Sequence, residues 1–348
     1  MKRHENNPLI TPKMLKPTMP GLEVLGAFNA GASVHNNQII LLLRVAERCI
    51  KDKNFVGVPV YEFESGKSTL KILRFKKNDP DVFLKDTRGI VYKGVDYLST
   101  LSTIRLARSS DGINFTVDDK PFIYPKMPEE KYGCEDPRIQ KIGKYFFITY
   151  SAVSQDGWAT SLIATIDFKT LERKGIIFYP LDKDVCLFPE KINGRYFALH
   201  RPHNVGFGKP SVWISSSDNL LDWGQHKCLI RPRDTEWERQ KIGAGGPPIK
   251  TDKGWLVIYH GKGDNSTYHL FTMLLSLDDP SKIIKRARKP FFSPVEEYET
   301  KGFFPNVVFS NGHVEQPSGE VFVYYGACDE TTNLFITSVD ELLSDVIK

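Results

Sequence analysis

A pattern of two short strands joined by a tight turn occurs five times along this chain of 348 residues. Each copy starts with small or polar residues, passes through a short apolar strand to a turn rich in Gly, Asn or Asp, and ends in a second strand. The five copies are residues 28–46, 134–152, 187–202, 244–261 and 303–327. This order is typical of a β-hairpin, and its repetition predicts a fold assembled from similar modules.

Two further strands accompany each hairpin. A strand that ends in a turn rich in Ser and Asp follows at 103–115, 161–172, 211–223, 269–283 and 333–343. A segment that ends in proline follows four of these strands, at 120–125, 175–180, 226–232 and 288–294, and a fifth such segment lies at 7–12. Four strands in each of five units predict an all-β, five-bladed β-propeller in which the N-terminal strand closes the last blade. We therefore expect residues 1–348 to form a single domain.

The composition favours a globular protein and argues against a nucleic-acid partner. Hydrophobic residues make up 41% of the chain and charged residues 26%, which allows a substantial core. The net charge is +5, and the densest basic run, KRARK at 285–289, is too short to contact many phosphates.

The cysteines and the N-terminal segment indicate a compartment. The five cysteines form an odd number and include no CxxC pair, which favours free thiols in a reducing environment. The first ten residues, MKRHENNPLI, lack the apolar stretch of a signal peptide, and no apolar run approaches the roughly 18 residues that cross a bilayer. We expect a soluble, cytoplasmic protein with no membrane partner.

Polar residues at equivalent positions of the five hairpins should converge, because the innermost strands of a propeller line a central channel. These residues are Asn29, Arg44, Glu135, Asp136, Arg138, Glu190, His200, Arg201, Lys241, Tyr259, His260, Tyr268, Asn306, Tyr325 and Asp329. One cavity would then hold several cations, few carboxylates and some aromatic rings, which suits an anion beside a hydroxyl-rich ligand. Tyr259 could equally be a core aromatic residue.

The segment YGCEDPRI at 132–139 places two acids and an arginine at the entrance of an apolar strand. Burying an unpaired charge costs several kcal/mol, so these groups either pair with one another or carry chemistry. An internal ion pair between Glu135 and Arg138 is the simplest interpretation, and it leaves Asp136 as the free carboxylate. Glu135 would raise the pKa of Asp136 and Arg138 would lower it, so the sequence leaves that pKa open.

Two other motifs are better explained as structure. The histidines of HRPH at 200–203 lie three residues apart, so a strand points them to opposite faces and no metal site is expected. ESGKST at 64–69 lacks the first glycine of a P-loop and is interpreted as a turn.

Four ordered motifs resemble glycoside hydrolase family 130, the β-mannoside phosphorylases and related β-1,2-mannosidases. The motifs are GCEDPRI, LFPEKINGRYFALHRP, KIGAGGPPIKTDKGWLVIYHG and FFPNVVFSNG, and the resemblance runs from about Asn7 to Asp329. It implies a five-bladed β-propeller and an inverting reaction in which phosphate releases α-mannose 1-phosphate from a terminal β-mannoside. It also implies that Asp136 is the general acid, whose proton passes through the mannose 3-hydroxyl.

The resemblance further implies which residues hold each substrate. The phosphate-binding residues would be Arg201, Lys241, His260, Tyr268 and Lys183. The sugar-binding residues would be Asn29, Arg44, Glu135, Arg138, Glu299 and Asp329. Phosphate is already an anion, so this chemistry needs cations to hold it and no carboxylate to activate water. The expected partners are a β-mannoside oligosaccharide and inorganic phosphate as co-substrate, with no cofactor or metal.

Several alternatives stay open at this point. Residues 16–48 look most like the β-1,2-mannobiose and β-1,2-oligomannan phosphorylases, whereas a β-1,4-mannosylglucose or mannooligosaccharide phosphorylase is the alternative. A β-1,2-mannosidase that uses water and a propeller that binds carbohydrate without catalysis are further alternatives. A homo-oligomer is a candidate assembly, and the acceptor sugar and the preferred chain length are not fixed by the sequence.

Overall fold

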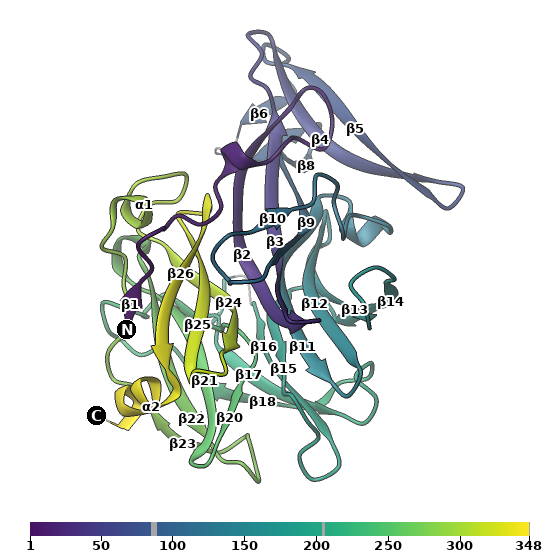
Figure 1. Cartoon of the computed structure of the whole chain (residues 1–348). Helices are drawn as coiled ribbons and strands as arrows, with labels where there is room; N and C mark the ends of the chain where they lie inside the picture. Colours follow the sequence, from purple (N-terminus) through teal and green to yellow (C-terminus); the bar gives the residue numbers. More distant parts are fainter. Residues whose placement is uncertain (85–88, 204–205, 348) are drawn as a thin grey trace.

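The computed structural model describes residues 1–84, 89–203 and 206–347, and it confirms the all-β class. The strands form six sheets, and all five predicted hairpins are present (Figure 1). The helical elements are short: η1 (Pro12–Met14), η2 (Pro128–Glu130), η3 (Asp264–Ser266), α1 (Glu297–Thr300) and α2 (Val339–Ile347).

The largest sheet contains the first two hairpins. Its strands are β2 (Leu22–His35), β3 (Gln38–Cys49), β9 (Thr100–Ser109), β10 (Thr116–Val117), β11 (Gly133–Ile142), β12 (Tyr145–Ser154), β13 (Gly157–Thr165) and β14 (Glu172–Phe178). The two units join through one parallel pairing of Gly133 with Ser102. Gly133 has a φ of 137°, and a Cβ there would lie 2.6 Å from the Ser102 carbonyl oxygen, so the close approach requires glycine. This junction fuses two units that the repeat pattern treats as separate sheets.

The other three hairpins each form a sheet, and each sheet is numbered after its hairpin. The third sheet contains β15 (Asp182–Leu187), β16 (Tyr196–Pro202), β17 (Val212–Ser217) and β18 (Gly224–Ile230). The fourth contains β19 (Lys241–Ala244), β20 (Ile249–Thr251), β21 (Gly254–Lys262), β22 (Tyr268–Leu275) and β23 (Ile283–Arg286). The fifth contains β24 (Val308–Glu315), β25 (Glu320–Ala327), β26 (Thr331–Ser338) and β1 (Lys2–Arg3).

The N-terminal segment does join the C-terminal sheet, although not by the residues expected. Lys2 and Arg3 pair with β26, whereas the predicted strand 7–12 contributes only a single bridge from Ile10 to Thr332. The proline-ended segments 120–125 and 288–294 likewise form single bridges instead of strands. Each contains two prolines, which cannot donate the N–H groups that a longer ladder needs.

The long insertion between the first hairpin and β9 forms two small sheets beside the main body. They contain β4 (Phe55–Glu64), β5 (Lys67–Lys76), β6 (Val82–Leu84), β7 (Gly89–Tyr92) and β8 (Val95–Leu98). The β4–β5 hairpin projects from the molecule (Figure 1). Val58, Val60 and Ile90 pack with Tyr132 and Val153 in one buried cluster. This packing fixes the insertion next to the start of β11, where the YGCEDPRI segment lies.

Candidate active site

One cavity of about 750 Å³ receives side chains from all five hairpins and from the insertion. Ten of the twelve residues expected to hold substrates line it: Asn29, Arg44, Glu135, Asp136, Lys183, Arg201, Lys241, His260, Tyr268 and Asp329. The insertion contributes Asp96, Tyr97 and Leu98 at the same cavity. The structure therefore brings together residues that lie up to 300 positions apart in the chain, as convergence of the repeats predicts.

Equivalent β-bulges turn polar side chains into this cavity. The pairing of each of the first three hairpins shifts at the same place: after Phe28 in β2, after Glu135 in β11 and after Lys183 in β15. Asn29, Asp136 and Asp184 occupy the shifted positions, with φ values of 49°, 50° and 56°. Asn and Asp tolerate this left-handed conformation better than most residues, and a bulge re-aims a side chain out of the ladder. The repeat thus places one amide and two carboxylates at matching positions.

Asp136 is nearly buried and is held by two donors. Its Oδ1 accepts hydrogen bonds from Asn29 Nδ2 at 2.9 Å and from Arg44 Nη1 at 3.1 Å. Arg44 also donates through Nη2 to Glu135 Oε1 at 2.6 Å. The predicted Glu135–Arg138 pair is therefore wrong, and Asp136 is not a free carboxylate. The bulge between these two residues turns Arg138 toward β15 and β19 and leaves Glu135 beside Arg44.

The environment of Asp136 settles the direction of its pKa. Burial alone would raise the pKa, but the positive charges of Arg44 and Lys183 and the hydrogen bond from Asn29 together lower it below its usual value. The carboxylate is therefore ionised at neutral pH when the cavity holds no ligand.

A cluster of basic side chains surrounds Asp184, which lines the same cavity. Arg201 Nε lies 2.5 Å from Asp184 Oδ2, and Arg138 Nη2 lies 3.2 Å from Oδ1. His260 Nε2 is 3.5 Å from Oδ2 without forming a hydrogen bond. Lys241 lies at the same wall of the cavity. One buried carboxylate thus anchors Arg201 and Arg138, and Arg201, His260 and Lys241 line the cavity beside it.

Burial and like charges change the pKa values within this cation cluster. Burial, together with the charges of Arg201 and Lys183, lowers the pKa of Lys241 to about 7. Burial lowers the pKa of His260 well below its usual value, so its imidazole is neutral. Both ring nitrogens of His260 lack hydrogen-bond partners. The positive charges of this cluster are close together, and the ring nitrogens of His260 have no hydrogen-bond partner. A bound anion would supply both the negative charge and the hydrogen-bond partners.

The sequence reasoning missed Asp184. It selected Glu190 from the third hairpin, but Glu190 lies at the surface and forms an ion pair with Lys250. The signal was available in the chain, because Asp184 precedes an apolar strand at the position that Asn29 and Asp136 occupy in the first two hairpins. The quoted repeat segment began at residue 187 and so excluded it.

Arg138 and Glu299, expected to bind sugar, do not line the cavity. The guanidinium of Arg138 is buried and donates to the carbonyl oxygens of Gly245 at 2.7 Å and Ala244 at 3.0 Å. Its guanidinium forms four hydrogen bonds, three to backbone carbonyl oxygens and one to Asp184, so Arg138 holds Asp184 in place without lining the cavity.

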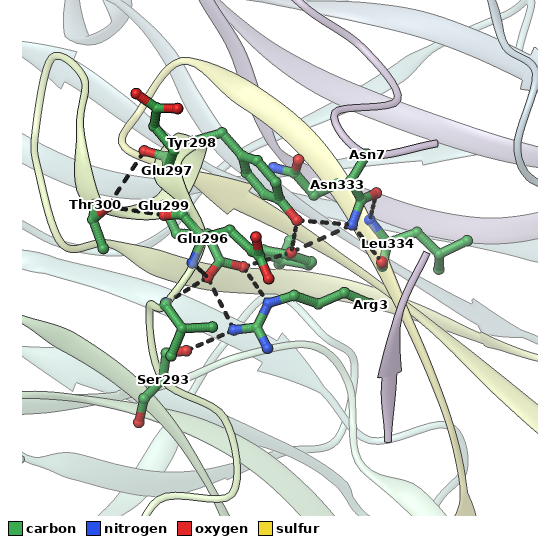
Figure 2. A network of polar contacts seen from close by, with 12 residues as sticks. Arg3, Asn7, Ser293, Glu296, Glu297, Tyr298, Glu299, Thr300, Asn333 and Leu334 are labelled. Carbon is green, nitrogen blue, oxygen red and sulfur yellow. Dashed lines mark hydrogen bonds and ion pairs between the residues drawn. The ribbon is translucent and has the colours of Figure 1, made fainter. Parts of the chain in front are cut away.

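Glu299 belongs to a separate polar network (Figure 2). Its carboxylate accepts two hydrogen bonds from Arg3, at 2.8 and 2.9 Å, and one from the Tyr325 hydroxyl at 2.7 Å. The backbone N–H groups of Val295 and Glu296 donate to its other side. Glu299 thus caps α1 and ties the N-terminal strand to the fifth sheet, which leaves no oxygen directed at the cavity.

Five further residues selected from the repeats also lie outside the lining: Glu190, His200, Tyr259, Asn306 and Tyr325. Tyr259 is fully buried in a hydrophobic cluster, as its alternative interpretation expected, and its hydroxyl accepts a hydrogen bond from Arg286. His200 pairs with Asp182 on the opposite side of β16 from Arg201. Alternation along the strand explains this difference, since neighbouring residues point to opposite faces.

All five cysteines are free thiols. No helix in the described ranges is long and apolar enough to cross a membrane.

Known proteins are similar to this chain in sequence. A family model described as β-1,4-mannooligosaccharide phosphorylase matches residues 79–348. The chain is 42% identical over 346 residues to the β-1,2-mannobiose phosphorylase of Listeria innocua serovar 6a, which covers 98% of this chain and 97% of the relative. It is 38% identical over 262 residues to the 1,2-β-oligomannan phosphorylase of a Thermoanaerobacter species, covering 73% of this chain and 86% of the relative.

A solved structure gives the same result in three dimensions. The β-1,2-mannobiose phosphorylase from Listeria innocua in complex with β-1,2-mannobiose superposes with a TM-score of 0.93 at 41% identity, over 99% of this chain and 98% of that chain. Residues 79–348 include every lining residue discussed above except Asn29 and Arg44.

Proposed function

Because this chain belongs to glycoside hydrolase family 130, we propose that it is an enzyme that cleaves terminal β-1,2-linked mannosides with inorganic phosphate. The products are α-D-mannose 1-phosphate and a sugar chain shortened by one mannose. The β-1,2 linkage is supported by the names of the relatives at 42% and 38% identity, whereas a relative named as a β-1,4-mannooligosaccharide phosphorylase is 33% identical.

One observation carries this proposal: a buried carboxylate and a cluster of cations lie in the same cavity. Asp136 is bonded to Asn29 and Arg44, and Arg201, Lys241 and neutral His260 line the same cavity with Asp184. The first group offers a proton-transferring acid beside polar side chains that bind hydroxyls. The second group can hold a phosphate and neutralise its charge before it approaches the sugar.

The residues divide between the two substrates. Arg201, Lys241, His260, Tyr268 and Lys183 hold phosphate. Asn29, Arg44, Glu135 and Asp329 contact the mannose that is transferred. Arg138 and Glu299 support the site through Asp184 and through the N-terminal strand, and they contact neither substrate.

The reaction exchanges one bond at the anomeric carbon. The proton of Asp136 passes through the mannose 3-hydroxyl to the glycosidic oxygen while the C1–O bond breaks. An oxygen of hydrogenphosphate forms the new bond to C1 from the opposite face, which inverts the configuration. The proton that hydrogenphosphate loses on becoming an ester replaces the one that Asp136 gave, so no base or cofactor is needed.

Substrate binding explains how Asp136 becomes protonated despite its low pKa. Lys183 and Arg44 are the charges that keep it ionised. A bound phosphate neutralises Lys183, and a sugar in the cavity excludes water from the carboxylate. Both changes raise the pKa of Asp136 toward that of a working acid.

We also propose the wider setting of the enzyme. The five hairpin units are the blades of a β-propeller and the chain is one catalytic domain, which is supported by their shared cavity and by the pairing of β1 with β26. Five free thiols support a cytoplasmic location. Phosphate is a co-substrate.

Incubation with β-1,2-mannobiose in the presence and absence of phosphate tests the function. Phosphorus NMR should show mannose 1-phosphate forming only when both substrates are present. Release of free mannose at the same rate without phosphate would replace this proposal with hydrolysis by water. Running the reaction in reverse, from mannose 1-phosphate with mannose, glucose, N-acetylglucosamine or mannobiose, identifies the acceptor and the linkage.

A further inference from the structure

A second cavity, of about 700 Å³, lies beside the first and plays no part in the proposed reaction. It is lined by β14, by the segment 179–182 and by β16, β17 and β18 of the next sheet. The two cavities share a wall. The ring of Trp158, which lines the first, contacts the ring of His203, which lines the second, with centroids 5.5 Å apart.

Aromatic rings form one side of this second cavity. Phe178 stacks between His200, at 4.7 Å and 30°, and Trp223, at 5.4 Å and 29°. Trp213 lines the same cavity, and Tyr179 stands at its rim with 82% of its surface exposed. The face of such an exposed ring is accessible to a ligand. The faces of aromatic rings pack well against the C–H groups of a sugar.

A chain of hydrogen bonds fixes the polar edge of the cavity. The buried carboxylate of Asp182 accepts a hydrogen bond from His200 Nδ1 at 2.7 Å. His200 Nε2 lies 3.2 Å from His226 Nδ1, so these two ring nitrogens share one hydrogen bond. Burial and the neighbouring His200 lower the pKa of His226, so this exposed imidazole is neutral. The edge therefore carries oriented hydrogen-bonding groups, which suit hydroxyl ligands.

The charge of this cavity differs from that of the catalytic one. Among the described residues that line it, Lys174 is the one lysine or arginine, and it forms an ion pair with Glu172. No group of cations is present there to hold a phosphate. The carboxylates of Asp182 and Asp222 also line the cavity, which disfavours an anionic ligand. Aromatic faces and imidazole groups instead favour an uncharged ligand with many hydroxyl groups.

We propose that this aromatic cavity is a second carbohydrate-binding site, which holds a neutral β-mannosyl chain outside the catalytic cavity. The identity of the sugar rests on the proposed function, whereas the presence of a carbohydrate site rests on the lining residues alone. A chain bound there is kept near the catalytic cavity across the shared wall, so its local concentration rises. Only long chains gain this increase in local concentration, because a disaccharide that occupies one cavity cannot also be held in the other.

Binding to an inactive protein tests this inference. In the Asp136→Asn background, calorimetry with a β-1,2-oligomannan should show two binding events per chain. Adding Tyr179→Ala and His226→Ala, both at exposed positions, should remove one event. Phe83→Ala is the matched control, because this aromatic residue is 64% exposed on β6 and lines neither cavity. The control should keep both events.

Kinetics provide the second readout. In the active protein, Tyr179→Ala with His226→Ala should raise KM for oligomannan about threefold to tenfold, the loss expected for an aromatic contact. The kcat/KM for mannobiose should stay unchanged. A single binding event in the parent protein, or two events of unchanged strength in the substituted one, would overturn the inference. If the substitutions remove a binding event in a protein that cleaves no mannoside, the proposed function fails and this second site stands.

Discussion

Replacement of Asp136 by asparagine separates catalysis from folding. The two hydrogen bonds to its side chain, from Asn29 and Arg44, both go to Oδ1. An amide oxygen can accept both, and Arg44 keeps its ion pair with Glu135 at 2.6 Å. Since the donors stay satisfied, we expect Asp136→Asn to change the free energy of unfolding by about 1 kcal/mol or less.

The effect on the reaction should be far larger. A positioned general acid contributes about 10²–10⁴-fold to the rate. This factor corresponds to about 3–5 kcal/mol in the activation free energy. The measurement is the formation of mannose 1-phosphate from β-1,2-mannobiose, together with a thermal melt of the same sample. A variant that melts like the parent and has lost at least this factor would agree with the assignment.

An aryl β-mannoside supplies the sharper test. Its phenolate leaving group departs without a proton, so loss of the acid should slow its phosphorolysis much less than that of mannobiose. Glu135→Gln is the matched control, because it removes the ion pair with Arg44 and leaves Asp136 in place. Equal losses on the two substrates, or more than a few per cent of activity left on mannobiose, would refute the role of Asp136 as the acid.

Three further predictions concern the charges around the site. Burial lowers the pKa of Lys241 to about 7, so this lysine loses its proton above that pH. The affinity for phosphate should therefore fall more steeply above pH 7 in the parent than in Lys241→Arg. The measurement is KM for phosphate as a function of pH. Asp184→Asn leaves buried Arg138 without its counter-charge, which should lower the free energy of unfolding by about 3–5 kcal/mol. Added phosphate should raise the melting temperature of this variant more than that of the parent. An equal rise in the two proteins would contradict the reasoning. Glu299→Gln breaks the buried pair with Arg3, and denaturant unfolding should show a loss of about 3 kcal/mol while kcat/KM of the folded protein is retained.

The repeat made the strands and the gathering of the site predictable from the sequence. Hairpins are local structures, so their turn residues and their alternation of apolar and polar residues can be recognised in the sequence. Residues at equivalent positions of the repeated hairpins are then expected to face one cavity. The partners of individual charges were not predictable. Arg44 rather than Arg138 pairs with Glu135 because a bulge between Glu135 and Arg138 reverses the direction of the following side chain. Sequence separation gives no warning of such a turn.

Asp184 and Glu299 illustrate the two other limits. Asp184 was detectable only by aligning the residue before each strand, since nothing in its own neighbourhood indicates that it meets three basic side chains. Glu299 was assigned to sugar through the resemblance, but the contact that fixes it comes from Arg3, 296 positions away. Pairs this distant depend on how the last sheet closes, which the local pattern does not specify.

The pairing of β1 with β26 has a consequence for how the chain is made. Residues 2–3 are synthesised long before their partners at 335–336. The pairing of β1 with β26 therefore cannot form until the ribosome has passed residues 335–336, and the contact of Arg3 with Glu299 must wait for residue 299. During that time the earlier sheets can fold, but the N-terminal segment must remain unpaired and accessible. Any contact that holds this segment elsewhere during synthesis would delay closure of the last sheet.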